Sequence, residues 1–450
     1  MIFLEKTLTL QKKMNPKDHQ ILRIALPAIV TNLTVPLLGL VDTAIVGHMG
    51  DAAYIGAIAV GSMIFSLVYW VFGFLRMGTS GMTAQARGKR DMEEVMRLLV
   101  RSLLGSMVIA LTIIVSQYPL REMMLWLIAP TADVRSLSVT YFNIVVWGAP
   151  AVLGLYSLSG WFIGMQNSRT PMLISIMQNV VNILASLSLV YGLGMKVEGV
   201  ALGTVIAQYA GLFAAVGLWW RYYRRLSHGK VLLMKEKFVD WLVFFRVNRD
   251  IFLRTLFLVA VNLYFTSAGA RQGAVILAVN TLLMQLYLFF SYFMDGFAYA
   301  GEAWGGRYWG AQDMVAFREV VRRLFVWGTA MVLLFTLVYV AGGMPFLRLL
   351  TDEPNVVEAS RDYVWWAYLI PIVGVAPFIW DGIFIGITAT RDMLVSSCIA
   401  AMVFFIGVTG LMGQMGNHGL WFSMILYLAT RGIVQTYLYH EQILRKPKSR

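Results

Sequence analysis

Hydrophobic residues along the 450-residue chain gather in long runs, and polar segments interrupt these runs at intervals. Residues 199–220, 273–294 and 324–347 contain no Asp, Glu, Lys or Arg. A helix needs about 20 apolar residues to cross a bilayer, whereas a membrane barrel strand is about ten residues of alternating polarity. The pattern therefore predicts an all-α polytopic membrane protein and excludes a β-barrel.

Twelve segments fit this pattern, which predicts twelve transmembrane helices. They are residues 21–45, 53–75, 98–117, 137–164, 172–194, 199–220, 251–270, 273–300, 319–342, 361–388, 394–413 and 419–440. An even number of spans places both termini on the same side of the membrane. The N-terminal residues lack an apolar core of signal-peptide length, so we expect the first span to act as an uncleaved insertion signal.

Composition and charge support this interpretation. The chain is 58% hydrophobic and 14% charged, where a soluble protein carries about 25% charged residues. Most of its 37 Lys and Arg residues fall in the connections on the N-terminal side. By the positive-inside rule, both termini then face the cytoplasm of a bacterial-type inner membrane. The net charge of +13 is thus a topology signal, and we expect no nucleic-acid partner.

The chain also repeats itself. The stretch around Gly160 and Gly164 matches that around Gly382 and Gly386, and Gly88 matches Gly310, each at an offset of 222 positions. Two separate matches at one offset predict two homologous six-helix bundles, related by a pseudo-twofold axis along the membrane normal. This is the parallel-repeat plan of many secondary transporters. We expect one bundle at 1–225, a basic cytoplasmic linker at 226–250 and a second bundle at 251–450.

Asp42 is the first candidate for chemistry, because it lies inside an otherwise apolar span. A charge at the centre of a membrane helix costs roughly 2.5–3.5 kcal/mol, so a carboxylate retained there is a functional candidate. Burial disfavours its charged form, which lets it bind and release a proton near neutral pH. Pro27 and Pro36 lie on the same span and can act as hinges, because each removes a backbone hydrogen bond. The alternative is a structural carboxylate paired with a buried polar group or water.

The second half carries three further acids. Asp295 and Glu302 are seven residues apart and so share one helix face. Both are possible cavity or substrate residues, although an ion pair between Glu302 and Arg307 is an equally plain explanation for the latter acid. Asp381 follows two prolines, and it either faces the cavity or caps a local turn.

The fifth span carries amides and a hydroxyl on an apolar background. Asn182 and Ser186 are four residues apart and share one face. We expect Asn182 to face the same interior as Asp42, with Asn179 and Ser186 as possible cavity residues. The alternative is that these side chains only join helices by hydrogen bonds.

Enzymatic motifs are missing from the chain. It contains no HExxH, no GxSxG and no Walker loop, and its single cysteine, Cys398, excludes Cys-pair metal and redox motifs. The five histidines are not at ligand spacing. We therefore expect no enzyme activity, no cofactor and no metal, so that the energy for transport comes from an ion gradient.

Several stretches in both halves resemble the multidrug and toxic compound extrusion (MATE) transporters, in particular their DNA-damage-inducible protein F (DinF) branch. They are LVDTAIVGHMG (40–50), FLRMGTSGMTAQARG (74–88), VNRDIFLR (247–254), DGFAYAGEA (295–303), DGIFIG (381–386) and GNHGLW (416–421). The resemblance implies two six-helix bundles around a central cavity. It also implies export of cationic or amphipathic compounds in exchange for protons or sodium, with Asp42 as the coupling carboxylate.

One position departs from the family pattern. Many members carry Asn and Asp four apart in the fifth helix, where this chain has Asn182 and Ser186. The seventh span also lacks the interior glutamate of the sodium-coupled branch. Both differences favour protons, with Asp42 and Asn182 at the coupling site.

The resulting hypothesis is a monomeric, proton-coupled exporter of cationic or amphipathic small molecules in the lipid bilayer. The alternatives within transport are sodium-coupled efflux and a flippase for lipid-linked glycans. A flippase usually needs a cationic cavity for pyrophosphate, whereas the interior charges assigned here are mainly acidic. A non-transporting membrane scaffold is the alternative from another class.

Overall fold

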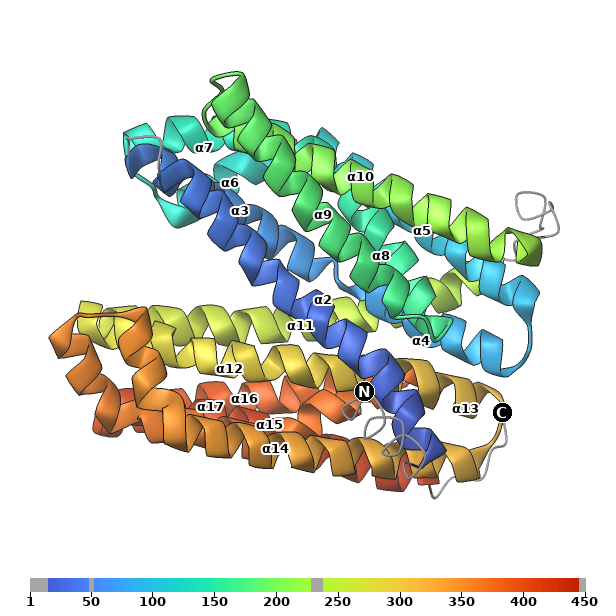
Figure 1. Ribbon diagram of the computed structural model, residues 1–450. Coiled ribbons are helices and arrows are strands. Elements are labelled where there is room, and N and C mark those ends of the chain that lie inside the picture. Colours follow the sequence, from blue (N-terminus) through green and yellow to red (C-terminus); the bar gives the residue numbers. More distant parts are fainter. Residues whose placement is uncertain (1–14, 48–51, 228–237, 445–450) are drawn as a thin grey trace, which may run out of the picture. The chain divides into compact units, whose positions relative to one another are not determined.

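The computed structural model describes residues 15–47, 52–227 and 238–444, and helices are the only regular structure in these ranges (Figure 1). Ten of the described helices are long and apolar enough to cross a membrane, and each coincides with a predicted span. The two remaining predicted spans, 21–45 and 419–440, form α2 (Pro16–Gly47) and α17 (Asn417–Leu438). The predicted all-helical membrane fold is therefore confirmed.

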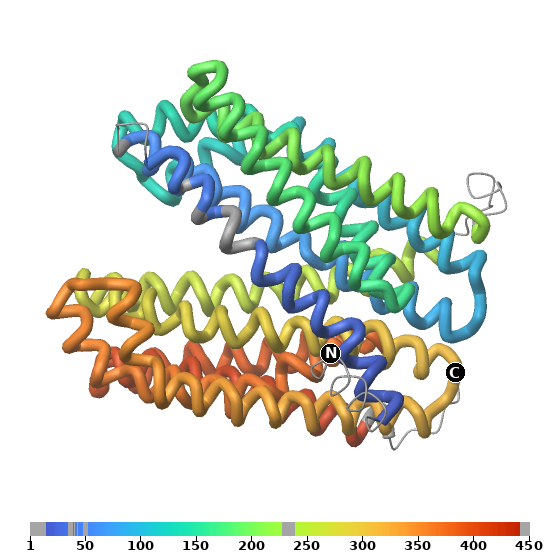
Figure 2. The backbone as a smooth tube through the Cα atoms, viewed as in Figure 1, coloured from blue at the N-terminus to red at the C-terminus, as the bar shows by residue number. Residues whose placement is uncertain are grey.

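The chain forms two compact units, whose course is visible in Figure 2. The N-terminal unit comprises the described residues between 30 and 245 and contains the second half of α2. Its other elements are α3 (Ala52–Val71), α4 (Phe74–Gly88), α5 (Met92–Val115), α6 (Gln117–Ile128), α7 (Ala132–Val145), the 3-10 helix η1 (Val146–Gly148), α8 (Ala149–Gly164), α9 (Arg169–Leu187), the π-helix η2 (Ser188–Gly192), α10 (Val197–Tyr223) and the 3-10 helix η3 (Arg224–Ser227).

The C-terminal unit comprises the described residues from 246 onwards together with residues 15–29. Its elements, besides the first half of α2, are α11 (Phe238–Arg271), α12 (Ala274–Ala300), the π-helix η5 (Gly301–Gly305), α13 (Gly306–Gly310), α14 (Met314–Leu350), α15 (Pro354–Gly386), α16 (Thr390–Met415), α17 and the π-helix η6 (Tyr439–Leu444).

The helices of the two halves correspond at the offset found in the sequence. α11 begins 222 positions after α2, and α14 spans the positions that match α5 and α6 together. α15 likewise matches α7, η1 and α8. Where α14 is continuous, the N-terminal half has a break at Ser116 between α5 and α6. Pro119, three residues later, has no backbone N–H to donate, and its ring crowds the preceding turn. The repeat is thus present element by element.

Close helix packing follows the same repeat. A Cβ atom built on Gly160 would lie 2.2 Å from the carbonyl oxygen of Arg76, and one on Gly382 would lie 2.2 Å from that of Ala298. The second pair corresponds to the first at the offset of 222 positions. Only a glycine lets the two backbones approach this closely, as is common between membrane helices. The glycines of the DGIFIG stretch are therefore packing residues.

The helix connections repeat as well. Asp91 caps α5 by accepting a hydrogen bond from the Glu94 backbone N–H at 2.9 Å, and Asp313 caps α14 by accepting one from that of Ala316 at 3.0 Å. Arg90 and Gln312, the preceding residues, both have φ near +60°. An N-cap oxygen satisfies a backbone N–H that the helix leaves unpaired.

The boundaries of the units differ from the predicted halves at the first helix of each half. Residues 15–29 belong to the C-terminal unit, because Asp18 accepts hydrogen bonds from Trp327 at 3.1 Å and from Arg323 at 3.4 Å. Residues 238–245 belong to the N-terminal unit, where Asp240 lies 3.6 Å from the buried Arg101.

The predicted linker 226–250 differs from the structure for the same reason. Residues 238–250 are the first turns of α11, which correspond by the repeat to the first turns of α2. The part of the linker at 228–237 lies outside the described residues.

Candidate functional site

The second half of α2 lies along α9 in the N-terminal unit. The Asn179 side-chain amide donates a hydrogen bond of 3.0 Å to the Thr34 carbonyl, and the Tyr191 hydroxyl donates one of 3.4 Å to the Ile45 carbonyl. The two segments therefore run side by side over about three turns. Asp42 lies between these two contact points, which places it level with the end of α9.

Asp42 is buried, with 6% of its surface exposed. Its Oδ1 atom has no hydrogen-bond partner among the described residues. A buried polar atom without a partner costs about 1–3 kcal/mol, and more when it is charged. The carboxyl group is therefore held in a position that suits a further ligand, of which a proton is the simplest.

Among the described residues, the polar groups that connect to Asp42 through Tyr141 are neutral. The Asn182 amide donates to Thr204 Oγ1 at 3.2 Å, and the Tyr141 hydroxyl lies 3.4 Å from Ser62 Oγ. Tyr141 is also within hydrogen-bonding reach of Thr204 and within electrostatic range of Asp42. The structure thus gathers polar side chains from α3, α7, α9 and α10 near the acid.

Tyr141, Thr204 and Ser62 were not predicted from the sequence. Each side chain carries one hydroxyl group on a helix, and such residues are common where helices pack. Only the meeting of four helices distinguishes them. Asn182, which was predicted, is fully buried, and its Oδ1 has no partner within the described part of the chain.

Ser186, which replaces the family acid, is fully buried against α10. A Cβ atom on Gly203 would lie 2.4 Å from Ser186 Oγ, so the two backbones pack closely at this point. The hydroxyl has no hydrogen-bond partner in the described ranges. Ser186 therefore offers an oxygen without charge, one turn after Asn182.

The two predicted hinge prolines lie in one continuous helix. α2 extends through both Pro27 and Pro36 without a break. The division between the two units falls after Ile29, two residues beyond Pro27. The side chain of Pro36 lies outside the described residues.

Asp381 lies in a buried ion cluster of the C-terminal unit. Its Oδ2 accepts hydrogen bonds from Arg254 of α11 and Arg431 of α17, and its Oδ1 accepts one from Gln435 at 2.7 Å. All four residues are less than 9% exposed. The two guanidinium groups were not weighed in the sequence-based account of interior charge, and they balance the acids of this unit.

The two other acids predicted as cavity residues lie on consecutive elements, α12 and η5. Asp295 of α12 is within electrostatic range of Arg254. Glu302 is 1% exposed and lies in η5, which interrupts the α-helix between α12 and α13. The guanidinium of Arg307 stacks over the Trp304 ring at 5.1 Å.

Among the residues that the structure describes, no group of three His, Cys, Asp or Glu side chains is placed to hold a metal ion. The chemistry that the N-terminal site offers is therefore that of one buried carboxyl group among neutral oxygens. Such a group can exchange a proton.

The family model MatE matches residues 27–187 and 251–409, which is most of both halves. The chain belongs to the MatE family. This MatE chain is 37% identical to DNA damage-inducible protein F of Escherichia coli over 93% of its own length and 91% of the relative's. The resemblance to the DinF branch is therefore confirmed.

Two further relatives extend the comparison. The MatE chain is 25% identical to the probable multidrug resistance protein NorM of Bradyrhizobium diazoefficiens, over 82% of this chain and 80% of that one. Its fold matches a solved structure described as the outward-facing conformation of a multidrug resistance MATE family transporter of the MOP superfamily. That match has a TM-score of 0.84 at 18% identity and covers 96% of this chain and 98% of the other.

Proposed function

We propose that this MatE chain exports amphipathic organic compounds across the membrane in exchange for protons, with Asp42 as the coupling group. The observation that carries the proposal is the buried Asp42 carboxyl group with an unpartnered oxygen on a membrane helix. Membership of the MatE family and the likeness to a probable multidrug resistance protein support export of organic compounds.

A proton suits this site because the neighbours of Asp42 are neutral. An ionised carboxylate in an apolar setting is costly unless a cation compensates it, whereas the protonated acid is tolerated. Loss of the proton therefore favours an arrangement of α2 in which Asp42 reaches water or a cationic substrate. Alternation between the two forms links proton binding to the conformation of the transporter.

Sodium coupling is the alternative, and the oxygen ligands on hand argue against it. Hard cations are held by several oxygens, with carboxylates among them. The Asn182 and Ser186 oxygens near the site carry no charge. Asp381 has both of its oxygens occupied by Arg254, Arg431 and Gln435.

A flippase for lipid-linked glycans is the other alternative. It needs cationic groups free to bind pyrophosphate, and the buried Arg254 and Arg431 are instead engaged by Asp381. Because these two arginines also balance the acids of the C-terminal unit, a preference for cationic substrates rests on Asp42. Amphipathic character is thus the broader requirement for the substrate.

The transporter acts as a monomer in the inner membrane, with both termini in the cytoplasm. The distribution of Lys and Arg supports this orientation. A cysteine-accessibility assay tests this orientation with a cysteine placed at Ser116, after α5, or at Arg224, after α10. The proposal expects Ser116 on the outer side and Arg224 on the cytoplasmic side. A cysteine at Arg224 should therefore be labelled only after the membrane is permeabilised.

The decisive experiment is dye efflux from proteoliposomes under an imposed proton gradient or an imposed sodium gradient. We expect the proton gradient alone to drive efflux by the wild type, and Asp42→Asn to reduce that efflux at least 100-fold. Asp133→Asn, on an exposed residue in the first turn of α7, is the matched control and should transport normally.

Each contrary result removes a different part of the proposal. Efflux driven by sodium alone would overturn proton coupling while leaving export in place. Equal transport by Asp42→Asn would overturn Asp42 as the coupling group. Absence of gradient-driven efflux for a panel of cationic, neutral and anionic amphiphiles would favour the scaffold.

A further inference from the structure

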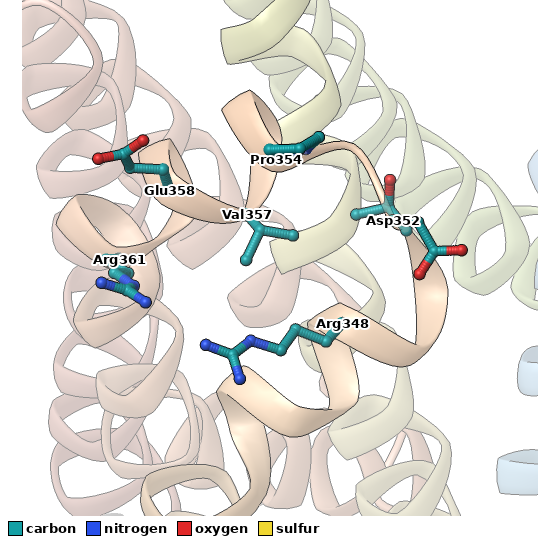
Figure 3. A pocket seen from close by; sticks show the side chains of 7 residues that line it. Arg348, Asp352, Pro354, Val357, Glu358 and Arg361 are labelled. Atoms are coloured by element: carbon teal, nitrogen blue, oxygen red, sulfur yellow. The ribbon is translucent and has the colours of Figure 1, made fainter.

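A pocket of about 500 Å³ opens at the turn between α14 and α15, at one end of the C-terminal unit (Figure 3). Its volume lies within the range of small-molecule sites, about 300–1,000 Å³. Two guanidinium groups, Arg348 and Arg361, and two carboxylates, Asp352 and Glu358, line it. Such a pocket offers both signs of charge to one occupant.

The four charged side chains do not neutralise one another. In the described part of the chain, no ion pair or hydrogen bond joins any of them to a neighbour. Figure 3 shows Arg348 extending from the end of α14 towards the side of α15 that carries Arg361. Glu358 lies on α15 close to Arg361, and Asp352 lies in the turn beyond the base of Arg348.

The repeat provides an internal comparison. The positions that match Arg348, Asp352, Glu358 and Arg361 at the offset of 222 are Trp126, Pro130, Ser136 and Val139, none of which is charged. The charged pocket is therefore a property of the C-terminal unit alone, and the repeated fold does not require it.

In the N-terminal unit, charged side chains near the matching turn, between α6 and α7, form ion pairs. Glu122 of α6 accepts hydrogen bonds from Arg121 at 3.0 Å and from Arg135 at 2.7 Å. Arg121 also donates to Asn143 at 2.8 Å. Side chains of this kind thus pair where they serve only to join helices, and those of the α14–α15 turn do not.

The pocket lies at the ends of two helices that are long and apolar enough to cross a membrane, where we expect the lipid head groups. α14 and α15 both qualify as membrane spans, and the turn between them lies at their boundary. Apolar side chains next to the pocket are exposed: 81% of Leu349, 37% of Phe346 and 42% of Trp365. Leu and Phe at this place suit acyl chains, and Trp prefers the interface.

We propose that this pocket binds the zwitterionic head group of phosphatidylethanolamine. Arg348 and Arg361 bind the phosphate, because guanidinium groups match phosphate oxygens in charge and geometry. Glu358, which lies on α15 close to Arg361, accepts hydrogen bonds from the primary ammonium. Phosphatidylglycerol would leave this carboxylate without a counter-charge, and the quaternary ammonium of phosphatidylcholine has no N–H to donate. This proposal does not depend on the proposed export function.

Native mass spectrometry of the purified full-length chain tests the assignment, with the three lipids carrying identical acyl chains at equal concentration. We expect the wild type to retain phosphatidylethanolamine in preference to the other two. The double variant Arg348→Gln/Arg361→Gln should lose about tenfold in its affinity for that lipid, the order expected for two exposed charge pairs. Arg121→Gln/Arg135→Gln, at the same end of the N-terminal unit, is the control and should retain the preference.

The acidic side of the pocket has a separate readout. Glu358→Gln removes the acceptor for the ammonium and leaves both arginines, so the preference should shift to phosphatidylglycerol, whereas Asp352→Asn should leave the preference unchanged. All four residues are exposed, and the variants should therefore fold. Equal retention of the three lipids by the wild type, or an unchanged preference in both Arg348→Gln/Arg361→Gln and Glu358→Gln, would overturn the proposal. Soluble glycerophosphoethanolamine that binds as tightly as the lipid would exclude a membrane lipid as the occupant.

Discussion

The side-chain amide of Asn179 donates a hydrogen bond of 3.0 Å to the backbone carbonyl of Thr34. This contact fixes α9 against α2 two turns before Asp42. It gives the predicted cavity residue Asn179 a positioning role, because its amide touches the helix that carries the acid.

Replacement of Asn179 by Ala should therefore weaken the placement of α2 without removing the acid. Loss of one hydrogen bond lowers the free energy of unfolding by about 0.5–1.5 kcal/mol. We expect efflux to fall several-fold while the coupling ion stays the same, which proteoliposome assays with both gradients can measure. Asn355→Ala, at an exposed position of α15, should change neither quantity; a variant at Asn179 that switched the coupling ion would contradict the positioning role.

The glycine pair of the repeat gives a prediction about stability. Gly160→Ala and Gly382→Ala each place a Cβ atom 2.2 Å from a backbone carbonyl oxygen, and a backbone cannot yield as a flexible side chain does. Overpacking of this kind costs about 1–3 kcal/mol, so thermal unfolding in detergent should occur at clearly lower temperature. Gly410→Ala meets no atom within 4 Å and should be neutral or slightly stabilising, since alanine favours a helix. Equal stability of all three variants would show that the close approach does not limit packing.

The ion cluster around Asp381 predicts a structural effect. Asp381→Asn leaves the buried Arg254 and Arg431 without their common carboxylate, and breaking a buried pair costs about 3–5 kcal/mol. Adding Arg431→Gln should restore part of the stability, because Arg254 then remains with Asp295 in electrostatic range. Thermal unfolding of the single and double variants measures this coupling. A single variant of normal stability that failed only in transport would instead place Asp381 in the substrate path.

Glu122 predicts a dependence of stability on pH. The hydrogen bond from Arg121, assisted by that from Arg135, holds the pKa of the Glu122 carboxyl below its ordinary value of 4.5. A carboxylate with a lowered pKa stabilises the fold above its ordinary pKa, and this contribution is lost as the pH falls through the lowered value. The difference in unfolding temperature between wild type and Glu122→Gln should thus be constant from pH 6 to 8 and vanish in acid. It should also shrink in 1 M NaCl, because the site is exposed; a difference that grew in acid would contradict this account.

Much of the fold could be predicted from the chain alone. Apolar runs long enough to cross a bilayer predicted the spans, because no backbone group can remain unpaired in lipid and a helix satisfies them locally. The offset between Gly160 and Gly382 predicted the repeat. The first turns of α2 and α11 lie in other units than the sequence indicated, since the partners of Asp18 and Asp240 are more than a hundred positions away and no local pattern records them.

The candidate site could likewise be predicted only in part from the sequence. Asp42 stood out in the sequence because a charge in an apolar span is costly wherever its neighbours lie. Its surroundings did not, because Tyr141 and Thr204 become relevant only when separate helices bring them together. For Asp381 the sequence recorded a buried acid, and the tertiary structure decided that Arg254 and Arg431 neutralise it. The sequence by itself determined which charged groups are costly to remove from water, since this desolvation cost depends on the residue and on the apolar segment around it. Only the tertiary structure decided which of them are compensated, because compensation acts through space between helices far apart in the chain.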